Sequence, residues 1–497
     1  MNKVPNQTNT YQAMWVGLGS LSSFAFTIVS AAILSRYLSK DEYGTYKQVM
    51  YVYNSLLIVF TLGLPKAYSY FLPKYDIKYG YSIVRKLNTM FLLIGFGFSI
   101  ILYCGSSIIA EILGNDKLVS SLKLFSLTPI FILPTMGIEG IMATHKRNNI
   151  NTIYVILTRI IMLVFVILPV MCYRANSESA IAGFTVSSFL VCIIGLYIKR
   201  IPYKGIISNK SDLTYYEIFR FSIPLMFASI GGIAIKFADQ FFVSRFFGPE
   251  QFADFANGST DVPFVGMVLG ASATILLPEF SRCLSKYHCS YEDIIELWRR
   301  TTLKAALAIY PLIVFCIFYA SDIMIFLYGN QYSSSATYFV VISIVNIFTI
   351  APYYPIIIAL GETKYYAKVH LFMAIFVWLI EYLTVCIYES VIAIAIVSAL
   401  LQIIKIIIMT NFISKRFNVR LLNLFRFNRL FAILFSNIAC CTIVYVLFKH
   451  LFILNNAFLV LLLSFTIYIS SILLTQKMFN LDYFVIIKPI INKFTRS

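Results

Sequence analysis

Seven ionisable residues lie inside long apolar stretches of this sequence, where an uncompensated charge is costly. The basic ones are Lys66, Arg159, Lys236 and Lys405, and the acidic ones are Glu139, Asp239 and Glu381. A charged side chain at the centre of a bilayer costs at least ~2.5–3.5 kcal/mol, so it tends to face a cavity or a partner. Fixed positive charges can bind an anionic group such as a phosphate, and carboxylates can bind a coupling cation, H⁺ or Na⁺.

Local pairing is the competing interpretation of the same residues. Lys236 and Asp239 are three residues apart, so they can neutralise each other on one helix face. Arg159 can pair with Glu139 on a neighbouring helix, and Lys66 can extend its ammonium group towards the membrane surface. The three carboxylates are therefore predicted as ion-coupling sites or as charge partners, and both interpretations stay open.

The composition requires that these residues sit in membrane-spanning helices. The chain has 497 residues, of which 59% are hydrophobic and only 12% charged, whereas soluble domains carry about 25% charged residues. The apolar residues fall into blocks long enough to cross a hydrocarbon core of about 30 Å. The sequence predicts an all-α polytopic membrane protein with about 14 transmembrane helices, at 14–35, 47–72, 88–109, 122–143, 151–173, 180–198, 217–244, 252–280, 303–320, 336–360, 366–387, 391–412, 430–448 and 454–475.

The net charge of +18 follows the predicted topology. Loops on one side of the membrane, together with both chain ends, hold 28 of the 40 Lys and Arg residues, Lys199 among them, and loops on the other side hold eight. The positive-inside rule places the first set, and both termini, in the cytoplasm. We therefore expect no nucleic-acid partner. The loops are too short for a catalytic domain, so we expect no enzyme activity.

Metal and cofactor chemistry has little support in the sequence. Seven of the nine cysteines lie in apolar runs, where a thiol behaves as a small hydrophobic group. Cys283, His288 and Cys289 share a polar loop, but without a second ligand cluster they are weak evidence for a metal site. No glycine-rich phosphate loop or nucleophile motif is present. We expect no metal, no cofactor and no catalytic residue.

An internal duplication organises most of the chain. Residues 35–46 (SRYLSKDEYGTY) match residues 244–255 (SRFFGPEQFADF), and Ile112-Leu113-Gly114-Asn115 matches Leu327-Tyr328-Gly329-Asn330. Each offset spans six helices, so the two halves point the same way through the membrane. We expect two parallel six-helix bundles related by a pseudo-twofold axis along the membrane normal, an arrangement typical of transporters. The predicted domains are 1–200, 201–415, and 416–497 with helices 13 and 14 and a cytoplasmic tail.

Prolines and glycines interrupt the predicted helices at related places. Proline removes a backbone hydrogen bond and bends a helix. Interruptions are expected in helices 2, 4, 8 and 10, at Gly63–Pro65, Pro129 and Pro134, Pro263 and Pro278, and Pro352 and Pro355. Such pairs favour rocking of two bundles about a central site, although a plain kink explains each one equally well.

The loop of residues 36–46 resembles the R-x-L-x-x-x-x-x-G-x-Y loop of Wzx-type polysaccharide flippases. Residues 63–67 (GLPKA), 71–75 (FLPKY) and 326–332 (FLYGNQY) are also similar to that family. It belongs to the multidrug/oligosaccharidyl-lipid/polysaccharide exporter superfamily. The resemblance implies a flippase that moves undecaprenyl-diphosphate-linked oligosaccharide, a surface polysaccharide repeat unit as in O-antigen or lipopolysaccharide, to the outer leaflet of the bacterial inner membrane. It also implies that helices 13 and 14 hold the lipid tail, and it transfers no binding residues.

Combining both lines, we expect alternating access through a cationic central cavity lined by Lys66, Arg159, Lys236 and Lys405 in a monomeric protein surrounded by membrane lipids. The first alternative is a multidrug or organic-cation antiporter of the same superfamily, which would need carboxylates exposed in the cavity. The second is a membrane polysaccharide polymerase or ligase, which would need a large outward loop. The glycan and the driving force are not encoded in any pattern of the sequence.

Overall fold

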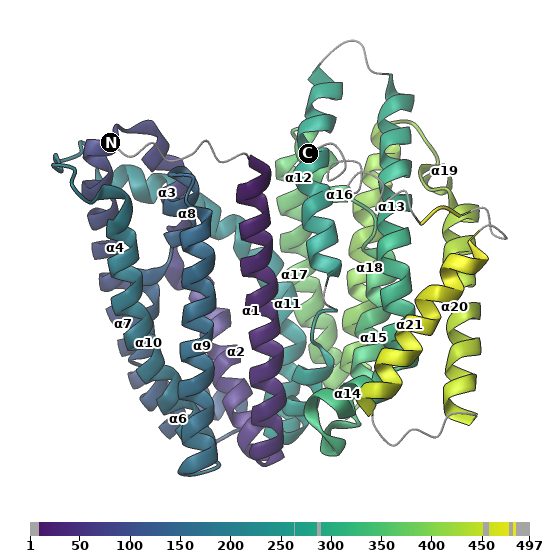
Figure 1. Ribbon diagram of the computed structural model, residues 1–497, viewed down its shortest axis with the longest axis horizontal. Helices are drawn as coiled ribbons and strands as arrows, with labels where there is room; N and C mark the ends of the chain where they lie inside the picture. Colours follow the sequence, from purple (N-terminus) through teal and green to yellow (C-terminus); the bar gives the residue numbers. More distant parts are fainter. Residues whose placement is uncertain (1–8, 263, 286–289, 451–456, 477–480, 484–497) are drawn as a thin grey trace. The chain divides into compact units, whose positions relative to one another are not determined.

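The computed structural model describes residues 9–262, 264–285, 290–450, 457–476 and 481–483. Every regular element in these ranges is helical, and most of the helices are long and run side by side within their bundle (Figure 1). The described part of the chain contains eleven helices long and apolar enough to cross a membrane, or up to thirteen if each of two bent pairs forms one span. The chain is therefore an all-α, multi-pass membrane protein, as the composition predicts.

Two compact units divide the chain, Met1–Ala253 and Asp254–Ser497. The first contains α1 (Asn9–Tyr37), α2 (Lys40–Thr61), α3 (Pro65–Phe71), η1 (Leu72–Lys74), α4 (Ile77–Cys104), α5 (Ser106–Leu113), α6 (Lys117–Phe125), α7 (Thr128–Ile132), η2 (Leu133–Thr135), α8 (Ile138–Thr144), α9 (Asn148–Cys172), α10 (Ser177–Arg200), η3 (Ile201–Tyr203) and most of α11 (Tyr215–Gly258). The predicted boundaries at residues 200 and 415 describe the duplication and remain a prediction.

The second unit contains the remaining helices. These are α12 (Val265–Ser285), α13 (Tyr291–Phe318), α14 (Ala320–Tyr328), η4 (Asn330–Tyr332), α15 (Ser335–Phe348), α16 (Tyr353–Ala359), α17 (Thr363–Ile387), α18 (Val391–Arg416), α19 (Leu421–Leu424), α20 (Phe427–His450) and α21 (Ala457–Thr475). Within this unit α20 packs against α13, and α21 packs against α20 and α14. A buried hydrogen bond from the Tyr468 hydroxyl to Asn437 Oδ1, 3.0 Å long, ties α21 to α20.

Element lengths in the two units support the duplication. The 28-residue α4 has a 28-residue counterpart in α13, and the 25-residue α9 has a 25-residue counterpart in α17. The matched glycines also play the same role, because Gly114 and Gly329 follow the short helices α5 and α14 with φ of 67° and 95°. Ser39 caps α2, and the matching Gly248 is a non-helical residue inside α11. The repeated sequence thus encodes repeated helix ends.

The predicted interruptions occur in helices 2, 4 and 10. Leu62 and Gly63 adopt left-handed conformations with φ of 50° and 71°, and Pro65 starts α3. The fourth span breaks into α6, α7, η2 and α8, and α15 and α16 meet at a 42° bend beside Pro352. In helix 8 the prediction is wrong at Pro278, because α12 continues through it, and Pro263 lies outside the described residues. A proline breaks a helix here only where neighbouring residues also leave the helical region.

Candidate functional site

The structure places three of the four predicted cavity cations in the first unit and one in the second. Lys66 is exposed in the first turn of α3, Arg159 is half-buried in α9, and Lys236 is exposed on α11. Lys405 is half-buried in α18 of the second unit. The internal duplication assigns Lys236 to the second half, whereas the compact units group it with Lys66 and Arg159.

Arg159 and Lys405 are the strongest candidates for binding an anion. Both lie within membrane-spanning helices, and neither forms an ion pair within the ranges that the structure describes. The expected alternative, a pair between Arg159 and Glu139, is not among these contacts. Glu139 is instead exposed in the first turn of α8, where a carboxylate interacts favourably with the helix dipole.

The pairing of Lys236 with Asp239 stays a prediction. The two residues lie one turn apart on α11, with Lys236 exposed and Asp239 buried. The backbone N–H of Gln240 donates a 2.8 Å hydrogen bond to Asp239 Oδ1. Glu381 is fully buried in α17 of the second unit. The roles of these carboxylates in ion coupling stay predictions.

Sequence reasoning missed a buried lysine. It counted Lys199 among the cytoplasmic loop residues, but Lys199 lies in the last turn of α10 with only 1% of its surface exposed. Its ammonium donates hydrogen bonds to the Tyr68 hydroxyl at 3.0 Å, Asn88 Oδ1 at 2.8 Å and the Met136 carbonyl at 2.6 Å. The only signal in the sequence is that Lys199 directly follows the apolar run, one residue beyond the predicted helix.

A polar network gives the flippase-like loop a structural role. Lys117 Nζ binds Asp41 Oδ2 at 2.6 Å and also contacts Glu42. The other oxygen of Glu42 accepts two 2.7 Å hydrogen bonds, from the backbone N–H and the hydroxyl of Ser177. This carboxylate therefore joins the start of α2 to the starts of α6 and α10. The loop residues hold helix ends together.

A second buried network lies one turn further along α2. Asn115 donates to the Thr45 hydroxyl at 2.9 Å and to Gln48 Oε1 at 2.6 Å, and Gln48 donates to the Ser244 hydroxyl at 2.8 Å. Arg245 also donates to the carbonyl of Glu111. Since Ser244 and Arg245 belong to α11, these bonds hold this helix to α2 and α5 of the first unit.

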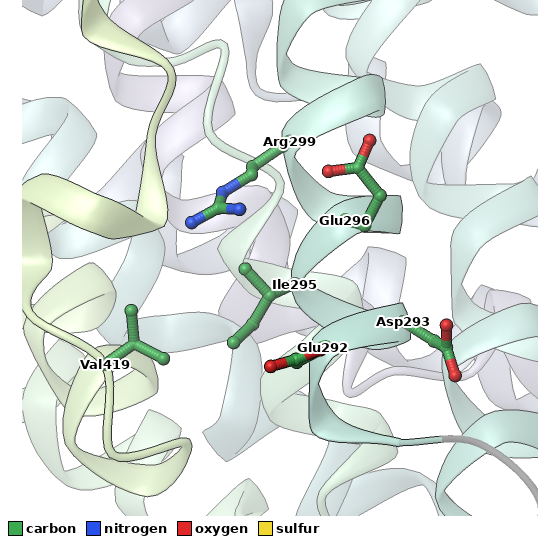
Figure 2. A pocket seen from close by; sticks show the side chains of 6 residues that line it. All are labelled: Glu292, Asp293, Ile295, Glu296, Arg299 and Val419. Carbon is green, nitrogen blue, oxygen red and sulfur yellow. The ribbon is translucent and has the colours of Figure 1, made fainter.

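A surface hollow beside the start of α13 contains none of the predicted residues. It has a volume of about 440 Å³ and is lined by Glu292, Asp293, Ile295, Glu296, Arg299 and Val419. Figure 2 shows Arg299 and Ile295 facing Val419, while Asp293 points away from it. Glu296 binds Arg300 and Arg426, and Arg299 donates to the carbonyl of Asn423 at 3.1 Å from Nε. These charges neutralise one another and join α13 to the α18–α20 connection, so the hollow is a poor anion site.

Metal ligands do not gather in the described ranges, where no three His, Cys, Asp or Glu side chains are placed to hold an ion. Cys283 is half-buried in α12, while His288 and Cys289 lie outside those ranges. The structure therefore adds no support for the weak Cys–His pattern of this loop.

Comparison with known proteins identifies the family and the fold. A family model described as "Polysaccharide biosynthesis protein" matches residues 11–284. Lipid II flippase MurJ, in an inward closed conformation, is similar to 94% of this chain and 98% of its own, with a TM-score of 0.65 and 14% identity. An inward-facing MATE family multidrug resistance transporter of the MOP superfamily is similar over 80% of this chain and 94% of its own (TM-score 0.60, 12% identity).

A MATE transporter from Vibrio cholerae is also similar, over 82% of this chain and 95% of its own, with a TM-score of 0.55 and 13% identity. No curated protein matches the sequence. At these identities the structural neighbours show a common fold and nothing about substrates.

Proposed function

The chain belongs to the polysaccharide biosynthesis protein family, and from that premise we propose that it is a flippase for undecaprenyl-diphosphate-linked oligosaccharide. The substrate moves from the cytoplasmic to the outer leaflet of the bacterial inner membrane. Both termini lie in the cytoplasm, and one chain suffices for transport. The similarity of the fold to that of Lipid II flippase MurJ supports this choice.

The observation that carries the proposal is the placement of Arg159 and Lys405. Each is a half-buried cation within a membrane-spanning helix, and each lacks an ion pair in the described part of the chain. A diphosphate leaving water needs fixed positive charge to replace its hydration, and guanidinium and ammonium groups supply charge-assisted hydrogen bonds. Lys66 and Lys236 are exposed and can bind the same group at another stage of transport.

The broken helices provide a route for conformational change. The spans at Lys40–Lys74 and Lys117–Thr144 in the first unit and at Ser335–Ala359 in the second each contain a break. Alternating access requires each unit to change shape or to rotate about a central site. Short helices that end at glycine or proline can reorient with few lost hydrogen bonds, so these breaks are the places where we expect movement.

The rival function, export of organic cations, needs carboxylates that a bulky ligand can reach. Asp239 is 8% exposed and Glu381 is fully buried, which suits a small coupling ion or a structural role better than an organic cation. The antiporter would be favoured if the chain exported cationic dyes and failed to move the lipid-linked substrate.

Reconstituted vesicles test the proposal directly. Purified protein in liposomes should accelerate leaflet exchange of a labelled undecaprenyl-diphosphate oligosaccharide over empty vesicles. Arg159→Ala and Lys405→Ala should each slow exchange by about tenfold or more, since a lost charge-assisted hydrogen bond costs about 1.5–3 kcal/mol. The matched control is Lys123→Ala, which removes an exposed lysine of α6 and should leave exchange unchanged.

Two results would contradict the proposal at different levels. No acceleration by the intact chain would refute lipid-linked transport. Normal exchange by both Arg159→Ala and Lys405→Ala, in a wild type that is active, would leave transport in place and eliminate the cationic site.

A further inference from the structure

Lys199 is buried in an arrangement that uses its full donor capacity. An ammonium group has three N–H donors, and the three acceptors around Lys199 come from three different elements, α3, α4 and the junction between η2 and α8. The Tyr68 hydroxyl donates onward to Asn88 Oδ1 at 2.8 Å, which closes the network. We call Lys199, Tyr68, Asn88 and the Met136 carbonyl the Lys199 cluster.

The charge of Lys199 is compensated without a carboxylate. No ion pair involves this residue within the described ranges. Its ammonium lies 4.6 Å from the centre of the Tyr68 ring and 5.8 Å from that of Phe91, at distances where aromatic faces attract cations. It also lies in the last turn of α10, where the helix dipole favours positive charge. Because dipoles and aromatic rings stabilise the ammonium only at short range, the stability of the buried charge depends on where each of these neighbours lies.

The Lys199 cluster forms where two spans are broken. The Met136 carbonyl follows η2, and Gly137 has φ of +81°, so the fourth span leaves helical geometry at this point. A Cβ at Gly137 would come within 2.0 Å of the Tyr68 ring. The ring thus occupies the space that the break opens, and Lys199 donates to a carbonyl at the same break.

The contacts of the Lys199 cluster also determine the direction of α3, the short helix near the end of the second span. This helix has seven residues and follows the left-handed Leu62 and Gly63, so the preceding helix does not determine its orientation. A helix of seven residues leaves most of its terminal backbone groups without partners inside the helix, so tertiary contacts must hold its direction. Ala67, Tyr68 and Phe71 are the buried residues of α3, and Tyr68 is the one that bonds to Lys199. The exposed Lys66 lies two residues before Tyr68 in the same helix.

We propose that Lys199 is a positioning residue that holds α3, α4 and the junction before α8 to the end of α10, and so determines where α3 presents Lys66 to an anionic substrate. The functional part of this inference rests on the proposed function. Its structural part does not, because the hydrogen bonds of Lys199 link the two broken spans whatever the substrate.

Hydrogen exchange in the full chain, reconstituted in lipid nanodiscs, tests the structural part. Lys199→Met keeps the length of the side chain and removes all three donors. We expect amide exchange in Pro65–Phe71 and Ile138–Thr144 to rise by about tenfold or more, since unsatisfied buried groups favour local opening. Exchange in α9 should change less than twofold.

Lys86→Met is the matched control. Lys86 is another lysine of the first unit whose ammonium binds backbone carbonyls, those of Ser211 and Leu213 in the connection before α11. It should leave exchange in α3 and α8 unchanged. If Lys199→Met fails to fold, Tyr68→Phe removes one partner and should give the same pattern with a smaller rise. Unchanged exchange in α3, or a uniform rise across the first unit, would overturn the inference.

A double-mutant cycle tests the functional part. Lys199→Met and Lys66→Ala should each raise the substrate concentration for half-maximal exchange by about fivefold to tenfold, and the double variant should be no worse than either within about twofold. If the increase in the double variant equals the product of the two single increases, Lys199 acts independently of Lys66, which would contradict a positioning role. Absence of exchange by the wild type would refute the proposed function, while hydrogen exchange would still decide whether Lys199 holds α3.

Discussion

Buried and half-buried cations in this chain divide according to what compensates them. Lys199 has a complete set of hydrogen-bond acceptors and two aromatic neighbours, which suits a permanent structural role. Arg159 and Lys405 have no ion partner in the described ranges and are half-buried. A group whose charge is only partly compensated gains most from an arriving anion, so these two suit transient substrate binding.

His145 provides a prediction at the residue scale. It lies between two spans and shares a 3.0 Å hydrogen bond with the Tyr203 hydroxyl. Burial, helped by the nearby Arg147 charge, lowers the pKa of His145 below its usual 6.5. The unfolded chain therefore binds more protons than the folded one near this pH, so the stabilisation is complete above about pH 6.5 and decreases as pH falls below it.

We expect the thermal unfolding temperature of the detergent-solubilised protein to fall from pH 7.5 to pH 5.5. His145→Gln keeps a polar side chain but does not titrate, so its unfolding temperature should fall less over the same range. Identical pH profiles for the two proteins would show that the titration of His145 does not contribute to the pH dependence of stability.

Glycines determine the positions of the helix breaks in the first unit more than prolines do. Pro169, Pro311 and Pro278 lie inside continuous helices, whereas Gly63 and Gly137 adopt positive φ at the two broken spans of the first unit. Positive φ is available to glycine at no steric cost and strains most other residues. These glycines, and not the prolines by themselves, determine where the spans change direction.

Gly137→Ala tests this view at the scale of the element. The added Cβ meets both an unfavourable φ and the Tyr68 ring, so we expect a loss of stability of at least about 1–3 kcal/mol. Gly97→Ala is the control, since nothing lies within 4 Å of a Cβ there and alanine favours a helix interior by about 0.5–1 kcal/mol. Thermal unfolding in detergent measures both. A Gly137→Ala protein as stable as wild type would refute the steric argument.

At the scale of the whole molecule, the compact units do not follow the repeat. The sequence repeat begins its second copy with α11, yet this helix is bonded to the first unit through Gln48–Ser244 and Arg245–Glu111 and by stacking of Tyr70 on Phe221 at 4.0 Å. The two copies therefore encode similar elements but distribute them differently. We expect α11 to move with the first unit during transport.

Gly44 is where that attachment is tightest. A Cβ on Gly44 would lie 1.9 Å from the carbonyl oxygen of Pro249, so the two backbones are in direct contact. Gly44→Ala should displace the part of α11 around Pro249 and reduce substrate exchange by about tenfold, with a loss of stability of about 1–3 kcal/mol. The matched repeat position is Ala253, where Ala253→Gly should be much milder. Wild-type exchange by Gly44→Ala would refute a rigid attachment at this point.

The sequence alone determined that this protein lies in a membrane and that its spans are helical, and the duplication stays a prediction from the repeated residues. These features depend on local patterns, since apolar runs and repeated glycines act over neighbouring residues. The resemblance of residues 36–46 also pointed to the family that the model matching residues 11–284 identifies. The residues predicted to bind the substrate, by contrast, could be selected only because they are basic and lie inside apolar stretches.

Only the tertiary structure decided which charges are compensated and by what. Lys199 and Lys405 are both lysines at the edge of or within apolar runs, but one is enclosed by acceptors from three elements and the other has no ion partner in the described ranges. The partners of Lys199 are 63, 111 and 131 residues away in the chain. Compensation of a charge depends on such distant groups meeting in space, which no pattern of neighbouring residues specifies.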